Sequence, residues 1–378
     1  MKIVHLLVDD KFIDSAIREF EIVSPNLHEY LIVAGPAPFR YLRSARIRRV
    51  SQAEWATRMA QPDVAAVVLH SLPANHYALV SRIPSRIQVI WLGWGYDYYG
   101  LINDAFPQGL LLAATTSAAA TLSERSPVPV RGALRSSDLS VARHYAKPSR
   151  DDRAALARVD WFSPVLDDEY RLVRLHQPWF GARHLEWNYL TLEDDLVIDA
   201  SAAGRLGPNL LIGNSATTTN NHLEVFEHVR ERIDLDGRQL IVPLSYGDMR
   251  YADLIARTGQ RMFGEAFVPL RDFIAKERYL ALLNSCGIVV MNHIRQQALG
   301  NIMIGGLMGA RIFLNRANPL MRWLEKRGVQ VDDIDALQVQ PLDEGQRADN
   351  VRAITSFAGR SYRRALSSAL VRTALAQR

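Results

Sequence analysis

Cysteine and long apolar runs are what this sequence most clearly lacks. Cys286 is the only cysteine among 378 residues, so no internal disulfide can form, which fits a reducing compartment. It stands at the start of an apolar run, where a buried thiol is expected rather than a nucleophile. No apolar stretch reaches the ~20 residues that span a bilayer, and Gly109–Leu122 is expected to be a buried helix. The first residues have no signal-peptide pattern and are expected to form a strand.

Basic residues are only in modest excess over acidic ones. The net charge is only +5, and 48% hydrophobic with 22% charged residues is typical of a soluble globular protein. No nucleic-acid-binding motif occurs, so no nucleic-acid partner is expected. A basic cluster suits either a solvated face or the anionic headgroups of the inner leaflet. Its members are Arg40, Arg43, Arg46, Arg48 and Arg49.

Apolar strands alternate with helical spacing in the first half of the chain. Strands are expected at Lys2–Val8, Glu29–Ala34, Val64–Leu69 and Arg86–Leu92, with helices between them. Such alternation predicts a parallel sheet covered by helices, and ligands of these sheets gather at the carboxyl ends of the strands.

Several polar and aromatic residues are expected at that carboxyl edge. Asp10 follows the first strand, His70 ends a later one, and Trp94, Tyr96 and Asp97 follow Arg86–Leu92. Each also has a structural interpretation, because Asp10 is a possible helix cap, His70 a possible core histidine and Trp94 a possible packing residue.

A second alternation begins at Asn209–Ile212. This strand runs into Gly213, Asn214 and Ser215, and the polar loop then leads into an amphipathic helix. A later strand, Leu240–Leu244, is followed by Tyr246. Polar loops between strand and helix are suited to bind anions, because the first N–H groups of a helix have no partner inside it.

The stretch from Arg278 to Leu324 contains no Asp or Glu but several basic residues. Within it, the strand Gly287–Val290 leads through Arg295, Gln296, Gly300 and Asn301 into a buried helix expected at Ile302–Ala310. Arginine offers a planar set of donors to phosphate oxygens. We therefore expect this loop to hold the diphosphate of a nucleotide-activated donor.

The expected architecture is α/β, with two Rossmann-like αβα domains facing each other across a cleft. The expected ranges are 1–203, 204–345 and a C-terminal helical segment, 346–378, with its arginines facing solvent; residues 123–200 gave no clear organisation. A catalytic metal is not expected, because the Asp-x-Asp triplets at Asp234 and Asp333 fall in predicted surface loops.

Five segments in this order and spacing resemble the bacterial TDP-N-acetylfucosamine:lipid II N-acetylfucosaminyltransferases, a family of 4-alpha-L-fucosyltransferases. They are Leu211–Ser215, Val242–Gly247, Tyr279–Cys286, Arg295–Asn301 and Phe313–Pro319. The likeness is best over 209–320, and in the first half it rests on the Asp10 loop, His70 and Trp91–Tyr98.

This resemblance implies a GT-B glycosyltransferase of enterobacterial common antigen synthesis, peripheral on the inner face of the cell membrane. It implies a TDP-linked or UDP-linked sugar donor bound by the second domain at Gly213, Asn214, Ser215, Tyr246 and the Arg295–Asn301 loop. A lipid-linked saccharide would be received by the first domain, beside Trp94 and Tyr96. No cofactor is expected.

The acceptor hydroxyl needs a base, for which Asp10, Asp97 and His70 are the candidates. Two other functions suit the same features. One is a different nucleotide-sugar enzyme, such as an epimerase or a transferase with a soluble acceptor, and the other is a non-catalytic binding protein.

Overall fold

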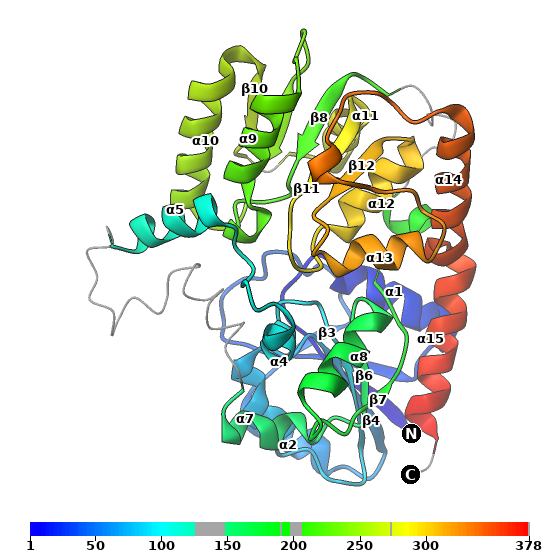
Figure 1. The fold of residues 1–378 in the computed structure, drawn as a ribbon. Coiled ribbons are helices and arrows are strands. Elements are labelled where there is room, and N and C mark those ends of the chain that lie inside the picture. Colours follow the sequence, from blue (N-terminus) through cyan, green and yellow to red (C-terminus); the bar gives the residue numbers. More distant parts are fainter. Residues whose placement is uncertain (125–147, 190, 197–205, 273, 377–378) are drawn as a thin grey trace. The chain divides into compact units, whose positions relative to one another are not determined.

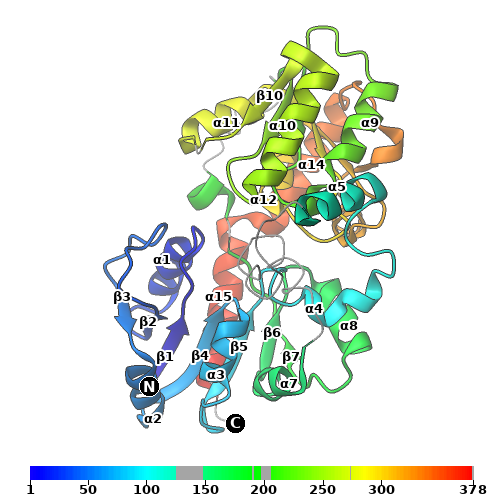
Figure 2. The same ribbon diagram turned by 90° about the vertical axis from the view of Figure 1, so that its left-hand side faces the viewer.

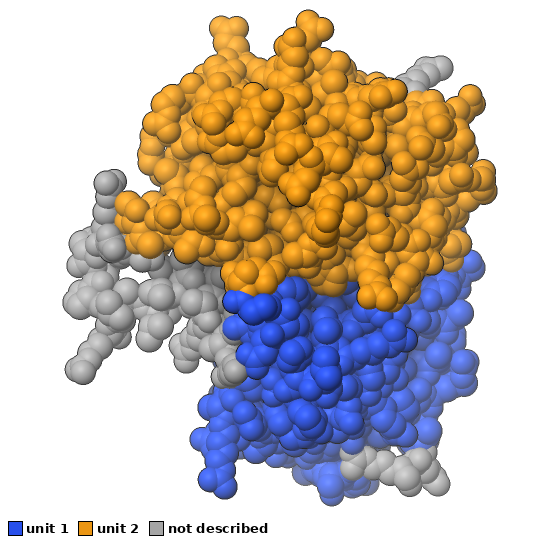
Figure 3. All heavy atoms as spheres, viewed as in Figure 1, with its two compact units in different colours: residues 1–107, 144–195, 358–378 blue, residues 108–143, 196–357 orange. Residues whose placement is uncertain are grey.

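The computed structural model describes residues 1–124, 148–189, 191–196, 206–272 and 274–376 (Figure 1). The chain divides into two compact units (Figure 3). Unit 1 contains 1–107, 144–195 and 358–378, and unit 2 contains 108–143 and 196–357. None of the described helices is both long and apolar enough to cross a membrane.

Unit 1 is built on a parallel seven-stranded sheet, in the order β3-β2-β1-β4-β5-β6-β7. Its strands are β1 (Lys2–Leu6), β2 (His28–Val33), β3 (Ile47–Val50), β4 (Val64–His70), β5 (Gln88–Leu92), β6 (Trp161–Ser163) and β7 (Arg183–His184). The central strands are buried on both faces, which explains their nearly continuous apolar sequences.

Helices cover this sheet because their apolar residues recur at helical spacing. In α1, the buried side chains of Ile13, Ala16, Ile17 and Phe20 form one stripe. Ala16 and Phe20 pack with α15 against β1, β4 and β5 (Figure 2), whereas Ile13 and Ile17 pack against β2. The helices of unit 1 are α1 (Ile13–Val23), α2 (Gln52–Ala60), α3 (Tyr77–Val80), α4 (Tyr99–Ile102), α7 (Arg150–Leu156), α8 (Asp167–His176) and α15 (Arg360–Leu375).

Unit 2 has a parallel six-stranded sheet, in the order β10-β9-β8-β11-β12-β13. Its strands are β8 (Asn209–Ile212), β9 (Leu240–Pro243), β10 (Phe267–Leu270), β11 (Cys286–Met291), β12 (Arg311–Leu314) and β13 (Asp332–Asp333). Its helices are α5 (Ala113–Glu124), α9 (His222–Arg232), α10 (Met249–Phe263), α11 (Lys276–Asn284), α12 (Leu299–Met308), α13 (Pro319–Glu325) and α14 (Glu344–Ala358). Each unit is therefore a Rossmann-like αβα structure, as expected.

The two units differ in two places from the ranges expected from sequence. Helix α5 belongs to unit 2, because Thr115 donates through N–H and Oγ1 to Glu224 of α9 at 2.9 and 2.6 Å. The C-terminal helices do not form a separate segment, since α14 belongs to unit 2 up to Phe357 and α15 to unit 1. Helix α5 is also not buried, because residues such as Ala114 and Thr116 are exposed. The domain boundary expected at 203/204 lies outside the described residues.

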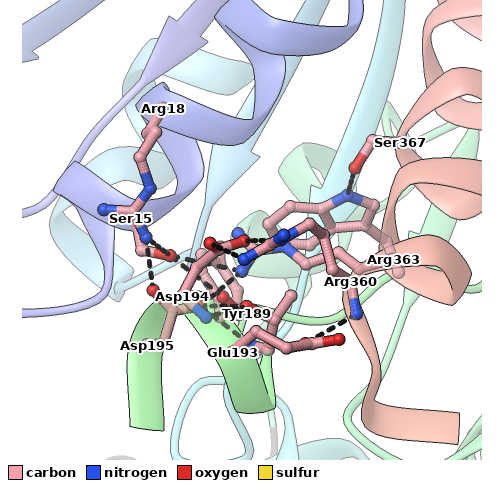
Figure 4. A network of polar contacts seen from close by, with 11 residues as sticks. Ser15, Arg18, Tyr189, Glu193, Asp194, Asp195, Arg360, Arg363 and Ser367 are labelled. Atoms are coloured by element: carbon pink, nitrogen blue, oxygen red, sulfur yellow. Dashed lines mark hydrogen bonds and ion pairs between the residues drawn. The ribbon is translucent and has the colours of Figure 1, made fainter. Parts of the chain in front are cut away.

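Arg363 of α15 was expected to face solvent, but the structure buries it at 2% exposure. Its Nη1 bonds Asp195 Oδ2 at 2.8 Å and Ser15 Oγ at 3.2 Å (Figure 4). Asp195 also pairs with Arg18 at 2.6 Å. The neighbouring Asp194 holds Arg360 through two bonds of 2.7 and 2.8 Å. The amphipathic pattern of α15 failed here because a carboxylate distant in sequence supplies the partner that a buried guanidinium requires.

Replacing Asp195 by Ala is expected to lower the free energy of unfolding of unit 1 by about 3–5 kcal/mol, because it leaves the buried Arg363 charge uncompensated. Arg363→Leu should cost less, since Asp195 keeps its bond to Arg18. Urea unfolding followed by tryptophan fluorescence measures both, because every tryptophan but Trp323 lies in unit 1. Equal losses in the two variants would contradict this account.

Candidate functional site

The loop after β8 is held in shape by one buried amide, that of Asn220. Its Oδ1 accepts from the Asn214 N–H at 2.9 Å, and its Nδ2 donates to the Thr217 carbonyl at 3.0 Å. Gly213 precedes this loop with a φ of +66°, and a Cβ there would come within 2.7 Å of Asn220 Oδ1 and of His222 Nε2. Glycine is therefore needed both for the backbone conformation and for the space.

The loop after β11 lies against the loop after β8. Gln297 donates to Asn214 Oδ1 at 2.9 Å and accepts from Thr219 Oγ1 at 2.8 Å. Ala298 then takes a left-handed conformation, with φ of 63°, and α12 begins at Leu299. Gly300 and Asn301 are therefore the second and third residues of the helix, not part of the expected loop. Their N–H groups belong to the first turn, which has no carbonyl partners within the helix.

The loop after β9 joins these two loops, so that residues 213–221, 244–248 and 292–301 together form a cradle. Its backbone pairs with the β8 loop, since the Ala216 N–H donates to the Tyr246 carbonyl at 2.7 Å. Asn214 Nδ2 donates to the Tyr246 hydroxyl at 2.9 Å, and Tyr246 is 41% exposed. Burial raises the pKa of Tyr279 on α11, as does Tyr246, while a hydrogen bond from the Asn301 side chain opposes this. Asn214, Tyr246, Tyr279 and Asn301 thus gather at the start of α12.

The remaining predicted donor residues lie in and around this cradle. Arg295 is half-buried and its Nη1 donates to the Gln296 carbonyl at 2.9 Å. The Gln296 side chain is buried, and so is that of Ser215, whose Oγ accepts from Asn220 Nδ2 at 3.1 Å. Ser215 therefore supports the loop from inside rather than presenting its hydroxyl to a ligand.

The positive charge around the cradle is smaller than the sequence of 278–324 indicates. Arg311 bonds Asp332 at 2.7 Å and Arg316 bonds Asp333 at 2.5 Å. Both carboxylates come from β13, which pairs with β12 in parallel. His293 is fully buried, and burial holds its pKa well below the usual value, so it is neutral at pH 7. Arg295 is the basic side chain among the predicted donor residues, and Arg311, Arg316 and His293 add little positive charge to it.

A cavity of about 360 Å³ opens at the carboxyl ends of β11, β12 and β13. Asn292 and Asn315 follow two of these strands and line it, with Asn315 Nδ2 bonded to Asn292 Oδ1 at 2.8 Å. Asp333 lines it as well, and its carboxylate holds Arg316 and accepts from the Asp335 N–H at 3.0 Å. No three metal-ligating side chains cluster among the residues that the structure describes.

In unit 1, the two aspartates after β1 have different environments. Asp9 accepts from the N–H groups of Arg40, Tyr41 and Leu42 at 2.7 to 3.2 Å, and although burial opposes it, these donors lower its pKa. Asp10 is half-buried and accepts from the Phe12 N–H at 3.1 Å. Burial raises the pKa of Asp10, so its carboxylate is a stronger base than an exposed one.

Asp97 is buried and its carboxylate holds three donors. Its Oδ2 accepts from the Leu72 N–H and the Trp91 indole at 2.9 and 2.8 Å, and its Oδ1 accepts from the Trp94 N–H at 2.8 Å. Burial raises its pKa, although these donors oppose the shift. The arrangement favours a role in shaping the loop after β5 rather than in taking a proton.

His70 is fully buried within a chain of hydrogen-bonded histidines. Its Nδ1 lies 3.1 Å from the Tyr189 hydroxyl and its Nε2 lies 2.8 Å from His5 Nδ1. His5 Nε2 then bonds His28 Nδ1 at 2.9 Å, and His28 Nε2 lies 3.0 Å from Ser24 Oγ. Both nitrogens of each ring are engaged, which favours the structural interpretation of His70.

The predicted acceptor residues do lie beside Asp10. The Trp94 ring stands edge-on to Phe12, Tyr96 and Tyr189 at centroid distances of 5.8, 6.3 and 5.2 Å. The Tyr96 hydroxyl is 2.6 Å from Ser71 Oγ, and burial raises its pKa, followed by the charges of Asp97 and Asp10. Asp10, Trp94 and Tyr96 are therefore close together, whereas His70 is separated from solvent by Tyr189.

Sequence reasoning missed the residues that hold the cradle together: Gln297, Asn220 and Tyr279. The long polar run at 213–221, between an apolar strand and an amphipathic helix, signalled a structured loop. Nothing in the sequence indicated that Gln297 bonds this run across about eighty residues.

Comparison with known proteins adds two findings. Residues 192–374 match the 4-alpha-L-fucosyltransferase family, glycosyl transferase group 56, and this range contains the whole cradle. The fold resembles a sucrose-phosphate synthase from Thermosynechococcus elongatus, with a TM-score of 0.64, 9% identity and coverage of 99% of this chain and 98% of that one.

Two further solved structures share the fold. A lipopolysaccharide outer core galactosyltransferase, WaaB, matches with a TM-score of 0.61, 8% identity and 99% coverage of both chains. Anabaena HepE, in complex with UDP and glucose, matches with a TM-score of 0.54 and 9% identity over 99% of this chain and 94% of that one. The expected GT-B fold and the resemblance over the second half are thereby confirmed.

The buried histidines predict that unit 1 loses stability in mild acid. Burial lowers the pKa of His28 to about 4 and that of His70 to about 3, and it also lowers that of His5. The unfolded chain binds these protons below about pH 6.5, so stability is complete above that pH and falls as the pH falls towards 4. His28 and His70 should each lower the free energy of unfolding by about 2 kcal/mol between pH 6.5 and 5.

Urea unfolding at pH 7.5 and 5.0, followed by tryptophan fluorescence, tests this. His28→Gln keeps a hydrogen-bonding side chain but does not titrate, so its loss of stability between the two pH values should be about 2 kcal/mol smaller than that of the wild type. An identical pH dependence in both proteins would show that His28 is not held neutral by the fold.

Proposed function

Because the chain is a glycosyltransferase of the GT-B fold, and its residues 192–374 match the 4-alpha-L-fucosyltransferase family, we propose that it transfers a deoxy-amino sugar from a nucleotide diphosphate to a lipid-linked glycan. N-acetylfucosamine is the proposed sugar, and TDP is the proposed nucleotide. The acceptor belongs to bacterial surface polysaccharide synthesis, which places the proposed reaction at the inner face of the cell membrane.

The cradle of unit 2 is the observation that carries this proposal. Its walls are neutral amides and hydroxyls, from Asn214, Thr217, Tyr246, Gln297 and Asn301. The hydrogen bonds that join Asn214, Thr217, Tyr246 and Gln297 run between amides and hydroxyls, and the first turn of α12 adds N–H groups that have no partner within the helix. Such a site suits a nucleotide diphosphate, because donors and a positive helix end meet the phosphate oxygens without a repelling charge.

The chemistry follows from where charge develops. Transfer breaks the bond between the anomeric carbon of the sugar and a phosphate oxygen, so negative charge grows on the leaving diphosphate. Arg295 and the N–H groups of Gly300 and Asn301 are proposed to stabilise it. Tyr246, which is partly exposed, is proposed to contact the base or ribose.

Asp10 is the proposed base that removes the proton from the acceptor hydroxyl. It is favoured over Asp97, whose carboxylate holds three donors, and over His70, whose ring is enclosed. Trp94 and Tyr96, which lie beside Asp10, are proposed to contact the acceptor sugar. Aromatic rings suit this because a sugar presents apolar C–H groups on one face and hydroxyls at its edge.

Replacing Arg295 by Ala should weaken TDP binding by one to two decades, since a hydrogen bond to a charged group contributes ~1.5–3 kcal/mol. Calorimetric titration with TDP and UDP measures this. Arg322→Ala is the matched control, because Arg322 is an exposed arginine on α13 of the same unit. If Arg295→Ala binds TDP as tightly as the control does, Arg295 does not contact the diphosphate.

Replacing Asp10 by Asn should lower kcat by about 10²–10⁴-fold, the usual contribution of a general base. Affinity for TDP should stay unchanged, because the nucleotide binds to residues of unit 2. The assay follows transfer from a TDP-sugar to a lipid-linked acceptor, with thermal unfolding as the check on folding. Near-wild-type turnover in a folded Asp10→Asn protein would remove Asp10 from the mechanism.

A further inference from the structure

The segment between β2 and β3, together with β3, carries charge of one sign only. From Tyr30 to Ala53 the sequence has five arginines and neither Asp nor Glu. Arg40, Arg43, Arg46 and Arg48 are exposed, while Arg49 is half-buried. β3 is the edge strand of the sheet of unit 1, and the chain that leads into it passes beside α1 (Figure 2).

The start of this segment is an exposed apolar tip. Residues 34–38, Ala-Gly-Pro-Ala-Pro, are all exposed and follow the carboxyl end of β2. Pro36 and Pro38 have no N–H group, so the tip has few polar groups that would lose water on leaving it. Phe39, next in sequence, is half-buried and packs against the core of α1 and β2.

Hydrogen bonds hold the end of the tip and the residues that follow it in place. Asp9 receives the N–H groups of Arg40, Tyr41 and Leu42, and Asp14 receives those of Arg43 and Ser44. Arg49 reaches back from β3 to donate to the Ala37 carbonyl at 2.7 Å, and its guanidinium lies 4.1 Å from the centre of the Phe39 ring. An ordered loop loses little conformational freedom on binding.

Charged residues often protect an edge strand from pairing with other chains, but either sign serves that purpose. Here the two aspartates that approach the segment are bonded to its backbone, and Glu21 pairs with Arg46, whose side chain remains 56% exposed. An apolar tip beside exposed arginines matches a surface that is anionic outside and apolar within.

We propose that residues 34–49 dock unit 1 onto an anionic phospholipid bilayer, with residues 34–38 entering the interface and Arg40, Arg43, Arg46 and Arg48 contacting lipid phosphates. The tip follows β2 at the same edge of the sheet as Asp10 follows β1, so docking brings the membrane to the side of unit 1 where the acceptor residues lie. The docking surface rests on the proposed lipid-linked acceptor, but vesicle binding is measured without any substrate.

A fluorophore at position 37 tests the proposal. Cys286 is buried, and burial raises the pKa of its thiol to about 12, so an environment-sensitive dye will label an introduced cysteine selectively. Labelled Ala37→Cys should shift to the blue with vesicles of mixed phosphatidylglycerol and phosphatidylcholine but not with phosphatidylcholine alone. The shift should weaken at 0.5 M salt, which screens exposed charges. Dye at Arg82→Cys, beyond α3, should not respond.

A second experiment removes two of the exposed positive charges and measures vesicle binding. In the Ala37→Cys background, Arg40→Gln with Arg48→Gln should weaken vesicle binding by about 25-fold, since each basic residue near an anionic membrane contributes about fivefold. Arg82→Gln with Arg171→Gln, which removes two other exposed arginines of unit 1, should change it less than twofold.

Three results would overturn the proposal: equal losses in the two double variants, an equal dye response at position 82, or a response to duplex nucleic acid in place of vesicles. TDP titration of the same proteins keeps the two proposals apart. Normal TDP binding without vesicle binding would refute the docking surface alone, and the reverse would refute the donor site alone.

Discussion

The cradle of unit 2 depends on the hydrogen bonds of a single buried side chain, that of Asn220. It joins the backbone at Asn214 to that at Thr217 and meets His293 at 2.9 Å, so it ties the β8 loop to the β11 loop. Backbone N–H and C=O groups in a buried loop need partners as much as those of a helix do. The Asn220 amide carries both a donor and an acceptor and therefore satisfies one group of each kind.

Unit 1 meets the same requirement with carboxylates. Asp97 fixes the loop after β5 through three donors, and Asp9 fixes the start of the Arg40–Ser44 segment through three N–H groups. A carboxylate whose oxygens already accept several N–H groups has little capacity left to take a proton from a substrate. This separates Asp9 and Asp97 from Asp10, although all three follow strands at the same edge.

Several arginines have acidic partners that a local stretch of sequence does not contain. Arg311 and Arg316 stand in a stretch without acids, yet parallel pairing of β12 with β13 places Asp332 and Asp333 beside them. The helical pattern of α15 fails in the same way, since Asp195 lies far from Arg363 in sequence but against it in space. Local sequence patterns cannot predict charge pairs between elements, because the packing of the elements decides which charges meet.

The sequence by itself determined the alternation of strands and helices, because apolar periodicity follows from the burial that each element requires. It also placed Gly213, Asn214, Tyr246 and the Arg295–Asn301 loop at strand ends, and Asp10 and Trp94 likewise. The tertiary structure decided which of these side chains face inward. It enclosed His70 in a chain of histidines, turned Ser215 inside and assigned α5 and α15 to their units. These outcomes depend on contacts between distant segments, where a hydrogen bond or an ion pair forms only once the fold has brought both partners together.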